Sequence, residues 1–162
     1  MWIDEEVDML TENEAAVISD IARRYEHPQG ASIEALRQIQ KSHGWISDED
    51  LRDIARVLRV TPEELDGVAT FYNLIFRRPV GRSVILLCDS VSCWAMGCGR
   101  ILAKLEGTLG VTLGQTTPDG RFTLLPTVCL GTCDHAPAMM IGRELFGDLD
   151  PDQLDSILDW YE

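Results

Sequence analysis

Apolar residues recur every three or four positions from residue 1 to about residue 78, the spacing that gathers them on one face of a helix. A first helix is predicted over residues 14–25, and a second begins at Ser32, which can cap it. A third follows Ser47, which is predicted to cap it. A fourth follows Thr61, where a proline and a capping-box glutamate come next. Short links between four amphipathic helices predict a small bundle. The apolar positions assigned to its inner faces are Val17, Ile18, Ile21, Ala22, Tyr25, Ile33, Leu36, Ile39, Leu51, Ile54, Ala55, Leu58, Leu65, Val68 and Ala69.

From about residue 80 the pattern changes to apolar runs separated by turns and one helix. Strands are predicted over residues 82–87 and 121–128, and the helix between them ends at Gly110. A hairpin follows within residues 138–146, and a terminal helix begins near Asp150. The continuous apolar run of the first strand predicts burial on both of its faces. The order β-α-β-β-α is that of a thioredoxin-like sheet.

The predicted fold class is α+β. The change of pattern divides the chain into a small helical bundle, residues 1–80, and a thioredoxin-like α/β domain, residues 81–162. A chain of 162 residues can bury one good core or two small ones, which is consistent with this division.

Composition and charge exclude several classes of function. The chain carries 27 acidic and 14 basic side chains, a net charge of −13, which argues against binding to nucleic acid. No apolar run approaches the ~20 residues that span a bilayer, so no membrane insertion is expected. Residues 1–6 lack the basic and apolar regions of a secretory signal, which predicts a reducing cytosol, where disulfides are rare. Five cysteines are also an odd count, so they are interpreted as ligands.

Four of these cysteines form two pairs, Cys88 with Cys93 and Cys129 with Cys133, and each pair follows a predicted strand. Four soft thiolates suit an iron–sulfur cluster or a zinc ion. Zinc sites more often have two residues between paired ligands, whereas these gaps are four and three. The spacing favours a cluster and leaves open a zinc-stabilised interaction module. A thiol enzyme is a third hypothesis, although no Cys-x-x-Cys motif is present.

Two residues near the pairs, Cys98 and His135, each have a structural and a functional interpretation. Cys98 is expected to be a small buried thiol, with a reserve ligand or redox-sensitive thiol as the alternative. His135 is expected to face solvent, the alternative being a hydrogen bond to a cluster sulfur. No Gly-x-Gly-x-x-Gly and no Walker A sequence is present, so the chain should not bind NADH or ATP unaided. No catalytic residue is predicted.

Longer motifs add a resemblance. The sequence has Cys-Asp-Ser-Val-Ser-Cys at 88–93, Gly-Gln-Thr-Thr-Pro-Asp-Gly-Arg-Phe-Thr-Leu-Leu-Pro at 114–126 and Cys-Leu-Gly-Thr-Cys-Asp-His-Ala-Pro-Ala-Met-Met-Ile at 129–141. The first half contributes Gly44-Trp45-Ile46 and residues 67–72. In these motifs the chain resembles the thioredoxin-like [2Fe–2S] ferredoxin subunits of bacterial NADH:quinone oxidoreductase, or respiratory complex I.

The resemblance implies one [2Fe–2S] cluster with Cys88, Cys93, Cys129 and Cys133 as ligands. It implies electron transfer within an enzyme complex and no catalysis by the isolated chain. The implied partners are the flavoprotein subunit, which binds FMN and NADH, and the adjacent iron–sulfur subunit. The helical N-terminal part is implied to help bind them. The location would be cytoplasmic, peripheral to the inner membrane. Close relatives belong to NAD-reducing hydrogenases and NAD-dependent formate dehydrogenases, which remain the alternative assemblies.

Overall fold

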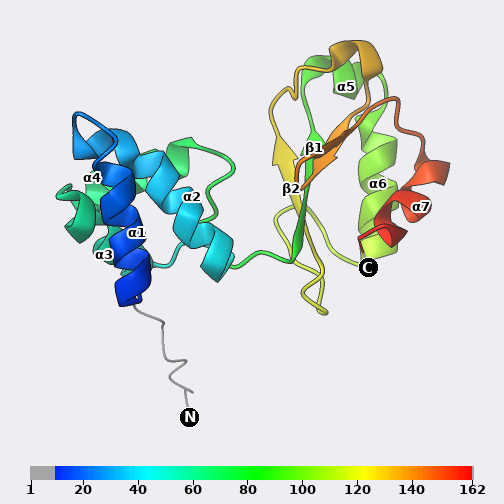
Figure 1. Ribbon diagram of the computed structural model, residues 1–162. Helices are drawn as coiled ribbons and strands as arrows, with labels where there is room; N and C mark the ends of the chain where they lie inside the picture. The colour runs from blue at the N-terminus through cyan, green and yellow to red at the C-terminus, as the bar shows by residue number, and fades with distance from the viewer. Residues whose placement is uncertain (1–9, 162) are drawn as a thin grey trace. The chain divides into compact units, whose positions relative to one another are not determined.

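The computed structural model describes residues 10–161 and divides the chain into two compact units, residues 1–79 and 80–162 (Figure 1). The first unit is helical, and the second combines helices with one sheet, so the α+β class is confirmed. Residues 1–6, on which the expectation of no secretory signal rests, lie outside the described residues. No helix within residues 10–161 combines the length and the apolar character that crossing a bilayer requires.

The helical unit packs four amphipathic helices around one core of aliphatic side chains. Ile18, Leu36, Ile54, Leu58 and Leu65 are among the residues that are almost wholly removed from solvent. The predicted inner faces of the third and fourth helices are therefore confirmed at their main positions. The helices are α1 (Glu12–Ala22), α2 (Ser32–His43), α3 (Asp48–Leu58) and α4 (Pro62–Phe71), with a 3-10 helix, η1 (Pro28–Ala31), before α2.

Three of these helices begin with a capping box. Thr11, Ser47 and Thr61 each accept a hydrogen bond from the backbone three residues on, and the acidic side chain there bonds back to the cap. The prediction was correct for Ser47 and Thr61 and wrong for Ser32. Ser32 is the first residue of α2, and its hydroxyl donates to the carbonyl of Gln29 because η1 leads directly into the helix.

The first helix also ends earlier than predicted. α1 stops at Ala22, so Tyr25 lies beyond it and is exposed rather than part of the core. The hydroxyl of Tyr25 donates to Glu34 at 2.9 Å, which places the ring against α2. The apolar spacing alone could not reveal that Tyr25 makes a surface hydrogen bond instead of packing in the core.

His43 joins three helix ends. Its Nδ1 lies 2.9 Å from Oδ1 of Asp50 at the start of α3, and its Nε2 lies 3.2 Å from Oε1 of Glu14 at the start of α1. Both carboxylates also close capping boxes, so the last residue of α2 ties together the first turns of α1 and α3. Hydrogen bonds to charged groups of this kind stabilise a fold by roughly 1.5–3 kcal/mol each.

The segment after α4 is fastened back onto the helices. The side-chain amide of Gln40 donates to the carbonyl of Leu74 at 2.9 Å and accepts from the backbone N–H of Phe76 at 2.6 Å. The guanidinium of Arg77 donates to the carboxylates of Asp66 at 2.8 Å and Asp48 at 2.6 Å. It also donates to the carbonyls of residues 46 and 47. The helical unit is therefore structurally fixed up to Arg77.

The second unit is built on a four-stranded sheet in the order β2-β1-β3-β4. β1 pairs parallel with β2 and antiparallel with β3, and β3 pairs antiparallel with β4, so the predicted hairpin is confirmed. The predicted strand and helix order holds, with the first strand shifted by one residue and the second one residue shorter at each end. The elements are β1 (Ser83–Cys88), α5 (Val91–Ala95), α6 (Cys98–Leu109), β2 (Phe122–Thr127), a 3-10 helix η2 (Cys133–His135), β3 (Met139–Ile141), β4 (Glu144–Phe146), a 3-10 helix η3 (Pro151–Gln153) and α7 (Leu154–Asp159).

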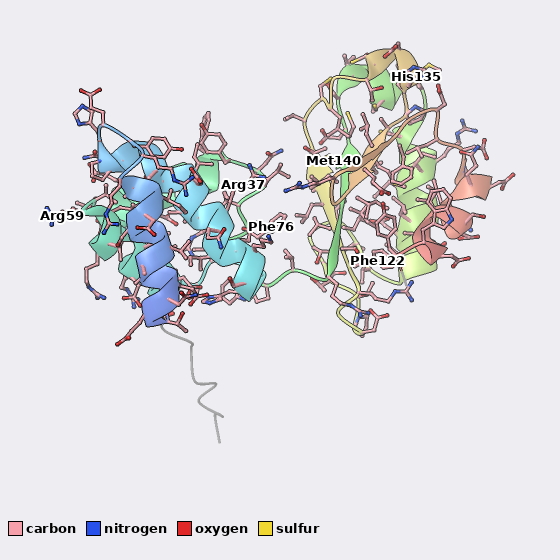
Figure 2. All side chains as sticks on the ribbon, viewed as in Figure 1. Arg37, Arg59, Phe76, Phe122, His135 and Met140 are labelled. Atoms are coloured by element: carbon pink, nitrogen blue, oxygen red, sulfur yellow. The ribbon has the colours of Figure 1, made fainter. Side chains whose placement is uncertain are left out.

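Helices α6 and α7 cover one face of this sheet (Figure 1). Ile85 and Leu87 of β1 pack there against Ile101 and Leu105 of α6, all of them buried. Leu86 points the other way along the strand and is also buried, as the continuous apolar run predicted. Figure 2 shows Phe122 and His135 near opposite ends of the unit, and the two cysteine loops lie at the end marked by His135.

Candidate metal centre

The parallel pairing of β1 and β2 brings the two cysteine loops together. Cys88, the last residue of β1, is in register with Thr127, the last residue of β2. Parallel strands have their carboxyl ends at the same edge of a sheet, so residues 89–93 and 128–133 leave the sheet side by side. The backbone N–H of Asp89 donates to the carbonyl of Thr127 at 3.1 Å, which joins the start of both loops.

The first loop contains a short helix that the sequence pattern did not predict. α5 carries Cys93 in its centre, and the side chain of Cys93 is buried beside that of Cys88. Gly97 separates α5 from α6 with φ +96°, a left-handed conformation that disfavours a side chain. Five residues are too few to produce a helical repeat, which is why the pattern contained no signal here.

The second loop holds its cysteines by a tight backbone turn. Gly131 has φ +83°, and its N–H donates to the sulfur of Cys129 at 3.3 Å. The sulfur atoms of Cys129 and Cys133 are also 3.3 Å apart. The end of η2 is held by the segment that follows β4, because the backbone N–H of Asp148 donates to the carbonyl of His135 at 2.6 Å. A Cβ atom at Gly147 would lie only 2.6 Å from Cβ of His135, so this close approach requires glycine.

All four paired cysteines line one hollow at this end of the unit. It contains about 190 Å³ of atom-free space, part of it open to solvent. So small a hollow suits a compact group. The residues that line it are Cys88, Ser90, Ser92, Cys93, Cys129, Leu130, Thr132, Cys133 and Ala138.

The thiols meet as two pairs, Cys88 with Cys93 and Cys129 with Cys133. Across residues 10–161 no three Cys, His, Asp or Glu side chains converge as ligands of a single metal ion. Two pairs of thiols around one hollow fit a binuclear cluster, in which each iron takes two thiolates. The donor set and its arrangement therefore fit a [2Fe–2S] group.

The two pairs differ in burial. Cys88 and Cys93 are 1% and 3% exposed, whereas Cys129 and Cys133 are exposed. Burial and a hydrogen bond with Cys88 raise the pKa of Cys93 to about 11. The Gly131 N–H, followed by a bond from Cys133, lowers the pKa of Cys129. A metal must displace the proton of each bound thiol, so Cys93, with its raised pKa, depends on the cation to become a thiolate.

Cys98 lies outside the hollow but beside it. It is the first residue of α6, is 8% exposed, and packs in one small buried cluster with Cys88, Cys93, Ala136 and Ala138. Burial, with smaller contributions from Cys88 and Asp89, raises the pKa of its thiol. The prediction of a small buried thiol is confirmed.

His135 follows the last paired cysteine by two residues and is exposed, as expected. Its Nδ1 lies 2.6 Å from the carboxylate of Asp148, which raises the pKa of the imidazole. The sequence pattern did not reveal this partner because Asp148 is brought in by the hairpin rather than by sequence proximity. Asp134 lies on the same exposed turn, with a carboxylate oxygen 3.5 Å from Nε2 of His135.

Large apolar side chains surround the cysteine loops without being covered. Trp94 of α5 is 73% exposed, and Val91, Met96 and Val128 are also exposed. We call these four residues the loop patch. The helical unit has a second group, Phe71, Tyr72 and Leu74, in which Phe71 is 80% exposed. In the sequence, Trp45, Phe71 and Tyr72 are aromatic residues at helix ends that could face a partner, with core packing as the alternative. Trp45 is partly buried. The loop patch has no such signal because most of it lies on or beside the unpredicted helix.

Comparisons with known proteins agree over nearly the whole chain. A family model described as thioredoxin-like [2Fe-2S] ferredoxin matches residues 18–162. The E subunit of the NADH-quinone oxidoreductase of Pseudomonas aeruginosa is 46% identical over 153 residues, which cover 94% of this chain and 92% of that protein. The protein of the same name from Escherichia coli K12 is 48% identical with the same coverage.

A solved structure is also similar. An NAD+-reducing [NiFe]-hydrogenase in the H2-reduced state aligns with a TM-score of 0.69 and 25% sequence identity. The alignment covers 80% of this chain and 22% of the hydrogenase chain. This chain therefore corresponds to a small part of that longer protein.

Proposed function

We propose that this chain, which belongs to the thioredoxin-like [2Fe–2S] ferredoxin family, is the electron-transfer E subunit of an NADH:quinone oxidoreductase. One observation carries the proposal. Four thiols line a single hollow in two pairs, in a chain that is 46–48% identical to proteins of that name over 94% of its length. The chain contributes to the enzyme as a subunit, and we expect no catalytic residue in it.

Cys88 and Cys93 would bind one iron and Cys129 and Cys133 the other. When bound, the cluster supplies one-electron transfer. The buried pair keeps water from one side of the site, and the Gly131 N–H donates to the Cys129 sulfur on the other. Such hydrogen bonds stabilise negative charge on sulfur and so favour the reduced state.

The partners in this proposal are the flavoprotein subunit, which would bind FMN and NADH, and the adjacent iron–sulfur subunit. The loop patch supports the first of them, because exposed aromatic and aliphatic side chains beside a redox site are suited to a protein interface. Phe71, Tyr72 and Leu74 support a second contact made by the helical unit. Through these subunits the chain would be held at the cytoplasmic face of the inner membrane.

Trp94→Glu is expected to weaken association with the flavoprotein subunit by tenfold or more. Loss of a central interface tryptophan commonly costs about 2 kcal/mol or more, and the new carboxylate must also be desolvated. Titration calorimetry with the purified flavoprotein subunit would measure the change in Kd.

Trp160→Glu is a matched control, because Trp160 is 72% exposed in the same unit but lies beyond α7. The Kd of the Trp160→Glu variant for the flavoprotein subunit is expected to equal that of the wild type. Equal weakening by both variants, or no weakening by Trp94→Glu while the cluster is retained, would rule out the loop patch as the docking surface.

A second candidate is the equivalent module of an NAD+-reducing hydrogenase, which the structural alignment supports. The oxidoreductase proposal is favoured because the chain is 46–48% identical to the oxidoreductase subunits and 25% identical to the hydrogenase chain. Co-purification of the tagged chain from its native cell separates the two by the enzyme activity that accompanies it, quinone reduction by NADH or NAD+ reduction by hydrogen.

The cluster itself is tested on the chain purified without oxygen. We expect two irons and two acid-labile sulfides per chain, no EPR signal when oxidised, and a rhombic spin-half signal after reduction with dithionite. Stoichiometric zinc without iron, persisting after attempted reconstitution, would make the site a structural zinc site and refute the electron-transfer proposal.

A further inference from the structure

The second cysteine loop ends in a helix that is too short to be stable by itself. η2 contains three residues, of which Cys133 is the first and His135 the last. The N–H of His135 donates to the carbonyl of Thr132 at 3.0 Å, which closes a single turn. One turn fixes several dihedral angles for little hydrogen bonding, so it depends on contacts with other parts of the fold. The position of Cys133 therefore depends on what holds His135.

Asp148 holds His135 (Figure 2) at two points. Its backbone N–H donates to the carbonyl of His135 at 2.6 Å, and one of its carboxylate oxygens lies 2.6 Å from Nδ1 of the imidazole. A carboxylate can only accept, so Nδ1 carries the hydrogen of the second bond. The backbone and the side chain at the end of η2 are thus both bonded to the same residue.

The chain on the far side of Asp148 is anchored in the core of the sheet unit. Leu149 is 6% exposed and packs in that core. Its N–H also donates to the carbonyl of Pro137 at 3.1 Å. Asp148 therefore connects a buried, well-packed residue to the end of the cysteine loop.

The backbone of Asp148 has an uncommon conformation. Its φ is +51°, and among residues 10–161 only one other residue that is not glycine, Arg59, has a positive φ. Most side chains disfavour this left-handed region, whereas aspartate and asparagine tolerate it better than most. Residues held in such conformations cluster at functional sites. In this conformation both the N–H and the carboxylate of Asp148 reach His135.

We propose that Asp148 is a positioning residue of the metal centre, which holds η2 through His135 and thereby keeps Cys133 in place as a ligand. This inference rests on the proposed function, since it concerns a bound [2Fe–2S] cluster. Without these bonds η2 moves more freely, and the Cys133 sulfur leaves the metal more readily. The side chains of His135 and Asp148 are 57% and 69% exposed, so water replaces part of a lost bond and the effect is moderate.

The inference is tested with Asp148→Ala and Asp148→Asn in the full chain, each loaded with its cluster and challenged with an iron chelator. Asp148→Ala is expected to lose iron about three- to tenfold faster than the wild type and to broaden the EPR lines after dithionite, because supporting residues of metal ligands commonly change affinity by about 10–100-fold and this one is exposed. Asp148→Asn keeps an oxygen acceptor and tolerates the left-handed backbone, so it is expected to restore nearly the wild-type rate. Asp152→Ala removes the same charge from η3 and is the control, with no change expected.

A double-mutant cycle with His135→Ala separates the bond from other effects of the two side chains. If Asp148 acts through His135, the double variant loses iron no faster than the faster of the two single variants. A wild-type rate in Asp148→Ala, or equal acceleration by Asp148→Ala and Asp148→Asn, would overturn the inference and leave the proposed function intact. A wild-type chain without the [2Fe–2S] signal would instead refute the proposed function, and the inference with it.

Discussion

Cys129→Ala is expected to abolish cluster binding, lowering iron and sulfide by more than about tenfold. Changes in residues that merely support metal ligands already cost about 10–100-fold in affinity, and loss of a ligand should cost more. Cys129 is also the cysteine whose sulfur accepts the Gly131 N–H, so alanine removes both a ligand and the acceptor of that bond. Iron and sulfide assays, with the EPR spectrum after dithionite, measure the outcome.

The same loss is expected for alanine at Cys88, Cys93 or Cys133. Cys98→Ala is the matched control, since Cys98 is a buried thiol beside the ligands but outside the hollow. It should retain the full cluster signal. A complete cluster in Cys129→Ala, or its loss in Cys98→Ala with the fold preserved, would contradict the ligand assignment.

Arg77→Ala is expected to destabilise the helical unit by about 2–3 kcal/mol. The guanidinium donates to two carboxylates and two backbone carbonyls, and its side chain is only 19% exposed. Hydrogen bonds to charged groups are worth about 1.5–3 kcal/mol each, but Asp48 and Asp66 are well exposed, so water offsets part of the loss. Urea unfolding followed by circular dichroism measures the change.

Arg78→Ala is the control for this experiment, because it removes the same charge from the residue that follows. Its effect is expected to stay within about 0.5 kcal/mol. Arg77→Lys keeps the charge but cannot reproduce the planar fork of donors, so its stability should lie between those of wild type and Arg77→Ala. Equal stability of the Arg77→Ala and Arg78→Ala variants would show that the network contributes nothing measurable.

Local rules identified much of the helical unit from the sequence. Ser47 and Thr61 were correctly assigned as caps because the hydroxyl and its acidic partner are only three residues apart. Ser32 misled the prediction because the 3-10 helix before it supplies a different partner. Tyr25 fitted the apolar spacing, but α1 ends before reaching it.

At the candidate site, the thiols and the strands that precede them could be identified from the sequence, because the cysteine spacing and the apolar runs are properties of neighbouring residues. The sequence pattern could not identify what the fold adds. α5 is too short to produce a periodic pattern, and the pairing of His135 with Asp148 depends on the hairpin between them. The assignment of the ligands remains a prediction until the variants are made.

The fastening of the segment after α4 has a consequence for assembly. The helical unit is fixed up to Arg77, and the sheet unit is fixed from Gly81, whose N–H donates to Thr123 at 2.6 Å. Arg78, Pro79 and Val80 are the whole tether between these anchors. Once one unit has docked, so short a tether keeps the other at a high effective concentration near its own binding surface. Two individually weak contacts could then hold the subunit firmly, and lengthening the tether would loosen it without altering either contact.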